Sequence, residues 1–393
     1  KILAAALNTN NGGVTKVPAI EDTPSNLATL STAEEAIAGT LISLYTASQA
    51  AITNLTGITY SIQGTASELE NMVQSKLDGA VNLRVTDAAT VAQSVFLNAA
   101  SNTGLVSISE ISDTSAALAA SSDTVIGNAT TVTATTNASM AEATTIAAFT
   151  QPVVYSVRDI AANIVAGPGL NEAKDIKVTD TGDVALAVLI QAATNSGTVT
   201  INKVEDTATN IAATTNQVVQ KALQVVATSV ATVAEATVIG GFDQAVTYSV
   251  EDVAANLQLG VGLNEAVNIV VTDTANIAQA TIVANATNSG SDSIFAISDT
   301  ATNIAGSQNT VVNKAGTVTA TSAATVSEAT VISGFVKAVT YSVQDLAANI
   351  EAGSALNEAV DISVTDTANV AKASLVEAAT NSGTTSIAGI RDV

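Results

Sequence analysis

Residues 246–256 read Val-Thr-Tyr-Ser-Val-Glu-Asp-Val-Ala-Ala-Asn and contain signals for a strand, a helix start and a helix. Val246–Val250 are β-forming residues in rough alternation, which favours a strand. Ser249 and Asp252 have the spacing of a capping box, with Asp in place of Glu. The Ala-rich run from Asp252 to Asn256 then has apolar positions at helical spacing. The stretch therefore predicts a strand, a polar cap and a short helix in immediate succession.

The same segment recurs along the chain with a period of 93 residues. Tyr155, Tyr248 and Tyr341 each open a Tyr-Ser-Val-x-Asp-x-Ala-Ala-Asn segment. The segment around Tyr60 is offset by two residues, which indicates an insertion or deletion nearby. Four further series keep the interval: Asp180, Asp273 and Asp366; Asn195, Asn288 and Asn381; Phe149, Phe242 and Phe335; and Asp113, Asp206, Asp299 and Asp392.

Each 93-residue block contains four shorter repeats of about 23 residues. In one block they begin near Val246, Asn268, Ser293 and Gly316. Each repeat reads as a strand, a cap, a helix of two to three turns and a loop, although some repeats could carry only a turn in place of the helix. The caps expected for the three later repeats are Asp273-Thr274, Asp299-Thr300 and the Thr325-x-x-Glu328 capping box.

A repeat this short cannot bury its own apolar face, so its neighbours must cover it. Strands that follow one another in the same sense form a parallel sheet with right-handed connections. We therefore expect an α/β right-handed solenoid, leucine-rich-repeat-like, with the parallel sheet on one side and short Ala-rich helices on the other. The expected blocks form one continuous solenoid: 1–57 (partial), 58–152, 153–245, 246–338 and 339–393 (partial).

The termini give a further expectation. Lys1 reads as a processed terminus or a fragment edge, and Asp392-Val393 falls in mid-repeat. A solenoid cut in mid-repeat exposes an unpaired strand edge, which soluble proteins normally protect. We expect either a longer parent chain or ends that stack on neighbouring copies, a head-to-tail contact that gives an open fibre.

Composition excludes several classes of function. The formal charge is −22, from 35 acidic and 13 basic side chains, which argues against nucleic acid and anionic lipid as partners. Only 12% of the residues are charged, and Cys, His and Trp are absent, so thiolate, imidazole and zinc-thiolate chemistry is excluded. No apolar stretch is long enough to span a membrane. We predict no enzyme activity, no membrane insertion, and no catalytic, cofactor-binding or metal-ligating residue.

Three segments resemble tandem repeats of very long bacterial surface proteins. They are residues 178–181 (Val-Thr-Asp-Thr), 252–257 and 297–305, the last reading Ile-Ser-Asp-Thr-Ala-Thr-Asn-Ile-Ala. Those proteins are described as adhesin-like, S-layer-like or filament-like, and the resemblance covers the chain from about Val14 onward. It implies an extracellular, secreted cell-surface protein of bacterial type, and it brings no shared activity or site.

Several recurrent residues have a functional and a structural interpretation. The repeated Asp residues could bind Ca²⁺, the single cofactor considered, but capping already explains them. Tyr248 and its equivalents could stack on sugars, but their alternation with Val246 and Val250 favours the core. The Thr-rich segments 131–135 and 317–321 suggest either an ice-binding surface or ordinary solvent-facing strands, and the second is favoured. Asn163, Asn256 and Asn349 are predicted to form a hydrogen-bonding row inside the solenoid. Glu34-Glu35 could serve glycoside chemistry, but nothing places them in a cleft.

These observations favour a structural extracellular surface protein that self-associates into a filament, sheath or S-layer-like assembly by repeat stacking. The expected partner is the chain itself, end-to-end or laterally, as a homopolymer. The alternative is an adhesin stalk or binding module that presents a repeat surface to a cell-surface or carbohydrate ligand.

Overall fold

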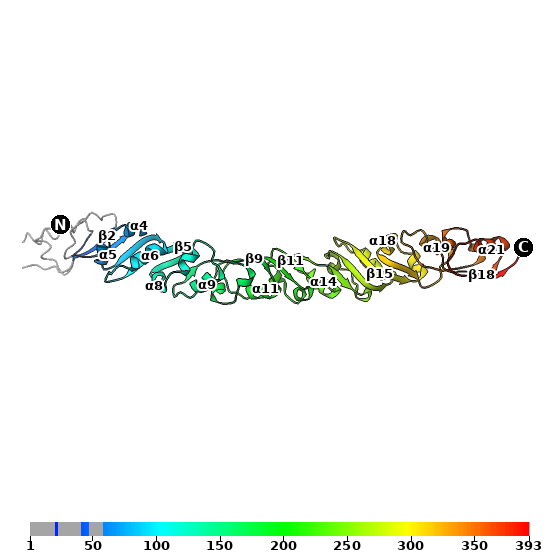
Figure 1. The fold of residues 1–393 in the computed structure, drawn as a ribbon, viewed down its shortest axis with the longest axis horizontal. Helices are drawn as coiled ribbons and strands as arrows, with labels where there is room; N and C mark the ends of the chain where they lie inside the picture. Colours follow the sequence, from blue (N-terminus) through cyan, green and yellow to red (C-terminus); the bar gives the residue numbers. More distant parts are fainter. Residues whose placement is uncertain (1–19, 23–40, 47–57, 393) are drawn as a thin grey trace, which may run out of the picture. The chain divides into compact units, whose positions relative to one another are not determined.

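The computed structural model describes residues 20–22, 41–46 and 58–392. It is an α/β structure of short parallel strands joined by short helices, drawn in Figure 1. The chain divides into two compact units: residues 1–181 with 188–201, and residues 182–187 with 202–393. Glu34-Glu35 and most of the predicted partial block 1–57 lie outside the described residues.

The first unit holds the blue-to-green elements of Figure 1. Its strands and helices are β1 (Ile20–Asp22), β2 (Leu41–Thr46), β3 (Ile58–Gly64), α4 (Ala66–Glu70), α5 (Gln74–Asp78), β4 (Leu83–Ala89), α6 (Val91–Asn98), β5 (Val106–Asp113), α7 (Ser115–Ala119), α8 (Asp123–Ile126), β6 (Ala129–Ala134), α9 (Met140–Ile146), β7 (Val153–Val154), β8 (Val157–Asp159), the 3₁₀ helix η2 (Ala161–Asn163), α10 (Pro168–Asn171) and most of β9 (Ile176–Gly182).

Helix α11 (Val184–Gln191) and β10 (Val199–Asp206) contain residues of both units. The second unit continues with α12 (Ala208–Ala212), α13 (Asn216–Val219), β11 (Val225–Ala227), α14 (Val233–Ile239), β12 (Val246–Thr247), β13 (Val250–Asp252), η3 (Ala254–Asn256), α15 (Val261–Asn264), β14 (Ile269–Ala275), α16 (Ile277–Ala284), β15 (Asp292–Asp299), α17 (Ala301–Ala305), α18 (Asn309–Val312), β16 (Ala315–Ala320), α19 (Val326–Ile332), β17 (Val343–Asp345), η4 (Ala347–Asn349), α20 (Ser354–Asn357), β18 (Ile362–Ala368), α21 (Val370–Glu377) and β19 (Thr385–Ile390).

The order of elements repeats with the period seen in the sequence. The succession of a three-residue strand, a 3₁₀ helix and a four-residue helix begins at Val157, Val250 and Val343. A seven-residue strand and an eight-residue helix follow each time, as in β14 and α16. The local sequence therefore specifies the same local structure in each block.

The strand pairs of the described ranges are all parallel and join strands that are consecutive in the chain. The first unit contains the sheet β1-β2-β3-β4-β5-β6-β7 and the pair β8-β9. In the second unit, β10 pairs with β11 and β11 with β12, followed by the sheets β13-β14-β15-β16 and β17-β18-β19. The expected α/β class with parallel sheets is confirmed.

The core is built from small aliphatic side chains on alternate strand positions. In β14, Ile269, Val271 and Ala275 are buried while Thr272 and Thr274 are exposed. On α19, Val326, Ala329 and Ile332 face the core at helical spacing. Each of these two elements thus buries three apolar side chains on the face that it turns to the core.

Two of the predicted caps are wrong, and both errors have a local cause. Asp252 ends strand β13, and the residue before η3 is Val253, which makes no side-chain cap. The Ala-rich run forms a 3₁₀ helix of three residues because the backbone returns to the extended region at Leu257. The sequence left open whether this repeat carries a helix of two to three turns or only a turn, and the structure shows the turn.

The second error concerns Asp273-Thr274. Both residues belong to β14, which continues to Ala275, and the N-cap of α16 is Asn276. The cap predicted at Thr300 and the capping box of Thr325 and Glu328 are confirmed.

The sheets break at the recurrent tyrosines. β12 pairs with the strand before it and β13 with the strand after it, and Tyr248 lies between them. Its side chain is 2% exposed, as are those of Tyr155 and Tyr341. The Tyr248 hydroxyl donates to the carbonyl oxygen of Gly262 at 2.9 Å. The expected core position is confirmed, and the hydroxyl is satisfied by a main-chain carbonyl oxygen inside the protein.

Burial raises the pKa of Tyr248 to about 12, and the nearby Glu265 carboxylate acts in the same direction. The pKa of Tyr341 is raised to about 12 by burial and by Glu358. The buried phenols of Tyr155, Tyr248 and Tyr341 stand where one sheet ends and the next begins, and we call these positions the tyrosine corners. Their rings leave no exposed aromatic face that could stack on a sugar.

Candidate functional site: contacts between successive repeats

A carboxylate at the end of a strand binds the helix of the preceding repeat. Asp252 Oδ2 accepts the main-chain N–H of Val233, the first residue of α14, at 2.9 Å. Its Oδ1 accepts the N–H of Val253 and the Nδ2 amide of Asn256, both at 2.8 Å. The first N–H groups of a helix have no partner within the helix, so this carboxylate satisfies one of them from the next repeat. We call this three-bond arrangement the aspartate clasp.

The clasp recurs at equivalent positions in both compact units. The Asp residue is half-buried and the Asn four residues later is exposed. The five Asp–Asn pairs, each with the helix residue whose N–H the Asp accepts, are Asp159–Asn163 (Met140), Asp206–Asn210 (Val184), Asp252–Asn256 (Val233), Asp299–Asn303 (Ile277) and Asp345–Asn349 (Val326). Asp113 binds Val91 and Thr114 in the same way, but Ala117 stands where the Asn would be.

The other two repeats of a block bind the same N–H group by a simpler contact. Asp273 Oδ1 accepts the N–H of Ala254 at 2.6 Å, and Ser322 Oγ accepts that of Ala301 at 3.0 Å. In the block from 246 onward, the first helical N–H of each of the four repeats is therefore bound by a side chain of the following repeat. The contact is directional, since it always runs from one repeat to the next.

The clasp carboxylates are held in their charged form. Burial favours the neutral acid at Asp252, but the hydrogen bonds from Val233 N, Asn256 Nδ2 and Val253 N outweigh it and hold the pKa below its ordinary value. The same balance of burial against three hydrogen bonds lowers the pKa of the four other clasp residues, Asp159, Asp206, Asp299 and Asp345. Both oxygens are occupied by N–H donors, which is the environment of a structural cap.

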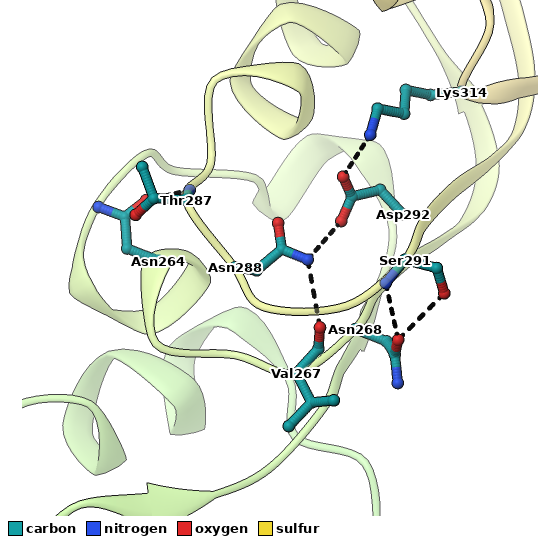
Figure 2. Close-up of polar contacts among 8 residues, drawn as sticks. All are labelled: Asn264, Val267, Asn268, Thr287, Asn288, Ser291, Asp292 and Lys314. Carbon is teal, nitrogen blue, oxygen red and sulfur yellow. Dashed lines mark hydrogen bonds and ion pairs between the residues drawn. The ribbon is translucent and has the colours of Figure 1, made fainter.

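A second set of contacts lies at the Asn-Ser-Gly loops, shown for one block in Figure 2. Asn268 Oδ1 accepts from Ser291, from the main-chain N at 2.9 Å and from Oγ at 3.0 Å. Asn288 donates to the Val267 carbonyl oxygen and to Asp292. Lys314 in turn binds Asp292 Oδ2 at 2.7 Å. The loop of one repeat is thereby tied to the loop before it, and the start of β15 is tied to Lys314, the residue that precedes β16.

In two other blocks the residue equivalent to Asn268 is an aspartate, whereas the first block has Asn82. Asp175 and Asp361 accept from the N–H and hydroxyl of Thr198 and Thr384 respectively. These exposed contacts lower the pKa of both carboxyls, mainly through the Thr main-chain bond. Asn and Asp are interchangeable here because both supply the acceptor oxygen, and the neighbouring serine hydroxyl accepts from Asn268 Nδ2 but donates to Asp175 Oδ2.

The predicted asparagine row is wrong. Asn163, Asn256 and Asn349 are exposed and lie one block apart, and each binds the clasp Asp four residues earlier. The sequence signal that was missed is the Asp-x-x-x-Asn spacing, which puts both side chains over one turn of backbone. The prediction of solvent-facing Thr strands is confirmed for Thr317 and Thr319, which are exposed on either side of the buried Val318.

Within the ranges that the structure describes, no three acidic side chains form a group that could hold a metal ion. The helices of those ranges are all too short or too polar to cross a membrane. Searches against protein families and curated proteins found no match to this sequence.

Proposed function

We propose that the chain is a structural extracellular surface protein that self-associates into a filament, sheath or S-layer-like assembly by repeat stacking. In this proposal the parallel sheets and helices form one right-handed, leucine-rich-repeat-like solenoid, and the repeats continue from one copy into the next. The extracellular, bacterial setting comes from the resemblance and from a composition rich in Ser, Thr and Asn.

The observation that carries the proposal is the directional contact between repeats. In the block from 246 onward, each repeat presents a strand edge and a helical N–H that its own helix leaves without an acceptor, and the next repeat supplies the acceptor and the pairing strand. Such a contact is heterologous: its two sides differ, so adding a repeat presents the same two groups again. Heterologous contacts that do not close generate open fibres.

The charge of the clasp residues also supports this role. The carboxylates that make the contact are ionised at neutral pH and bind N–H groups at the positive end of a helix. A second copy that presents an unoccupied carboxylate in the same way would therefore meet a complementary N–H. A protein of charge −22 needs such local compensation to approach a second copy of itself.

Sedimentation velocity across a concentration series, at neutral pH and with and without a calcium chelator, tests the proposal. Species heavier than one chain that grow with concentration are expected in both conditions. A single species of 39.1 kDa at every concentration would refute self-association. Loss of the heavy species on chelation alone would assign the contact to Ca²⁺ instead of to the clasps.

A further inference from the structure

An amine, a carboxylate and a carboxamide meet in the block from 246 onward, as Figure 2 shows. Lys314 Nζ lies 2.7 Å from Asp292 Oδ2. The other oxygen of this carboxylate, Oδ1, accepts the Nδ2 amide of Asn288 at 2.7 Å. The side chain of Asp292 is only 6% exposed, whereas that of Lys314 is 32% exposed. One nearly buried carboxylate therefore holds an amine on one oxygen and a carboxamide nitrogen on the other.

The carboxamide of Asn288 has a fixed orientation. Its Nδ2 also donates to the main-chain carbonyl oxygen of Val267, at 3.2 Å. A carbonyl oxygen can only accept, so the nitrogen of the amide, and not its oxygen, faces Val267 and Asp292. The atom that Asp292 binds is thus the nitrogen that leaves when an amide is cleaved, and the amine beside it is a nucleophile once it loses a proton.

The equivalent loops of the other blocks are held without this carboxylate. The second block has Asn195 and Lys221 at the equivalent positions, but Val199 in place of Asp292. The equivalents of Asn288 donate instead to a main-chain oxygen of their own loop: Asn102 to Gly104, Asn195 to Gly197 and Asn381 to Thr384. The fold of the loop therefore does not require Asp292, and its place between an amine and a carboxamide is specific to this block.

We propose that Lys314 and Asn288 form an isopeptide bond within the chain and that Asp292 catalyses this reaction by transferring protons. Asp292 Oδ2 accepts a proton from the Lys314 ammonium, and the resulting amine attacks Cγ of Asn288. The bond between Cγ and Nδ2 then breaks, and a bond between Cγ and Nζ takes its place. Two protons pass in turn from Nζ through the Asp292 carboxyl group to Nδ2, which leaves as an ammonium ion. A charged lysine and a carboxamide thus become a secondary amide and an ammonium ion, so atoms and charge balance without any co-reactant.

The distances suit this reaction. Both hydrogen bonds of Asp292 are within the range for proton transfer between a catalytic group and its substrate, about 2.6–3.2 Å. The amine and the carboxamide are separated by no more than one carboxylate group and its two hydrogen bonds, and the flexible stem of Lys314 lets Nζ move towards Cγ. Groups held this close in a folded chain react in a unimolecular step, which raises their effective concentration by several orders of magnitude.

The bond joins two consecutive repeats. Asn288 lies in the loop before β15, and Lys314 is the residue before β16. A covalent link between these points keeps the start of one repeat attached to the start of the next when the hydrogen bonds between them break, and it reduces the freedom of the unfolded chain. The bond forms within one chain, so it does not depend on the proposed self-association.

Three variants assign the reaction to its residues. Lys314→Arg keeps a positive charge beside Asp292, but a guanidinium does not give up its proton and cannot attack, so the full sequence mass is expected. Asp292→Val introduces the residue of the second block, Val199, and should slow the reaction by at least about a hundredfold, the usual contribution of a general acid–base. Lys221→Arg is the matched control at the equivalent lysine of the second block and should retain the loss of ammonia.

Circular dichroism of each variant shows whether it is folded, and Lys314→Arg, which keeps the charge, decides the question if Asp292→Val does not fold. A loss of ammonia that persists in Lys314→Arg, or that disappears in Lys221→Arg, would contradict the assignment of the bond to Lys314 and Asn288.

A second reaction loses the same mass and must be separated from the first. Asn288 is followed by Ser289, whose main-chain nitrogen can attack Cγ of Asn288 to form a succinimide. A succinimide leaves Lys314 open to trypsin, so cleavage there together with a loss of ammonia would overturn the inference.

Intact mass spectrometry of the full chain is the decisive measurement. The folded protein should weigh less than its sequence mass of 39.1 kDa by one ammonia molecule. After denaturation and digestion, trypsin should fail to cleave after Lys314, and fragmentation should identify one branched peptide that contains both Lys314 and Asn288. The full sequence mass in the folded chain would overturn the inference, because Lys314 and Asp292 would then form only an ion pair.

Discussion

Asp345 Oδ2 accepts the main-chain N–H of Val326, which begins the helix of the preceding repeat, at 2.9 Å. The bond joins residues 19 positions apart and closes one repeat onto the next. The same carboxylate also holds Leu346 N and the Asn349 amide. One side chain therefore organises its own strand end and caps its neighbour's helix, so its removal should affect two repeats.

Replacement of the central clasp residue should destabilise the fold. Asp252→Ala removes three hydrogen bonds to a charged acceptor and takes from the Val233 N–H the acceptor described above. We expect a loss of about 1–3 kcal/mol in the free energy of unfolding, measured by urea denaturation. Asn303→Ala, which imitates the natural Ala117 beside Asp113, should cost less, about 0.5–1.5 kcal/mol. Equal losses of unfolding free energy for both variants would contradict the view that the bond to the helix N–H contributes most of the stability of the clasp.

The clasps should make stability fall in acid. Each clasp Asp has a folded pKa below its unfolded value of 3.8, so the unfolded chain binds more protons as the pH falls. The stabilisation is fully present above the unfolded pKa and is lost as the pH falls through the lower folded pKa. Urea denaturation from neutral pH down to a pH below the unfolded pKa should show this decline, and Asp252→Asn should reduce its size. A wild-type stability that stays constant over this range would contradict the clasp.

The buried hydroxyl groups at the tyrosine corners should stabilise the fold, which can be tested by mutation and by raising the pH. Tyr248→Phe leaves the Gly262 carbonyl oxygen without its buried donor, at a cost of about 1–2 kcal/mol. Because the folded pKa of Tyr248 and Tyr341 is about 12, their stabilising effect is complete below the ordinary value of 10.0 and is lost as the pH rises through 12. A titration followed by ultraviolet absorbance should show that, as long as the protein stays folded, these phenols ionise only at a pH above their ordinary pKa. Normal ionisation in the folded state would show that the corner is open to water.

The corrected cap positions are also testable. Thr325→Ala removes the hydroxyl that accepts the Glu328 N–H and should cost about 0.5–2 kcal/mol. Thr274→Ala, at the position where the sequence suggested a cap, should have little effect because Asn276 caps that helix. Thermal denaturation of the two variants measures the loss of stability at each position. A larger loss of stability for Thr274→Ala than for Thr325→Ala would contradict the cap at Asn276 and favour the one that the sequence pattern suggested.

The local sequence predicts the class of the fold because its strongest signals act within a few residues. Alternation in segments such as Ile269–Ala275 and the Thr325 capping box need no knowledge of neighbouring repeats. The clasps could not be predicted in full because the partner of Asp252 lies 19 residues earlier, and only the stagger between adjacent strands decides which N–H it reaches. The error at Asn256 has a different cause: its partner is the local Asp252, and the Asp-x-x-x-Asn spacing that indicates this bond was missed.

Negative-stain microscopy of the purified chain, with and without a calcium chelator, tests self-association most directly. Repeat stacking predicts filaments or sheets that extend over many chain lengths in both conditions. Uniform particles no longer than one chain, in both conditions and at high protein concentration, would contradict it.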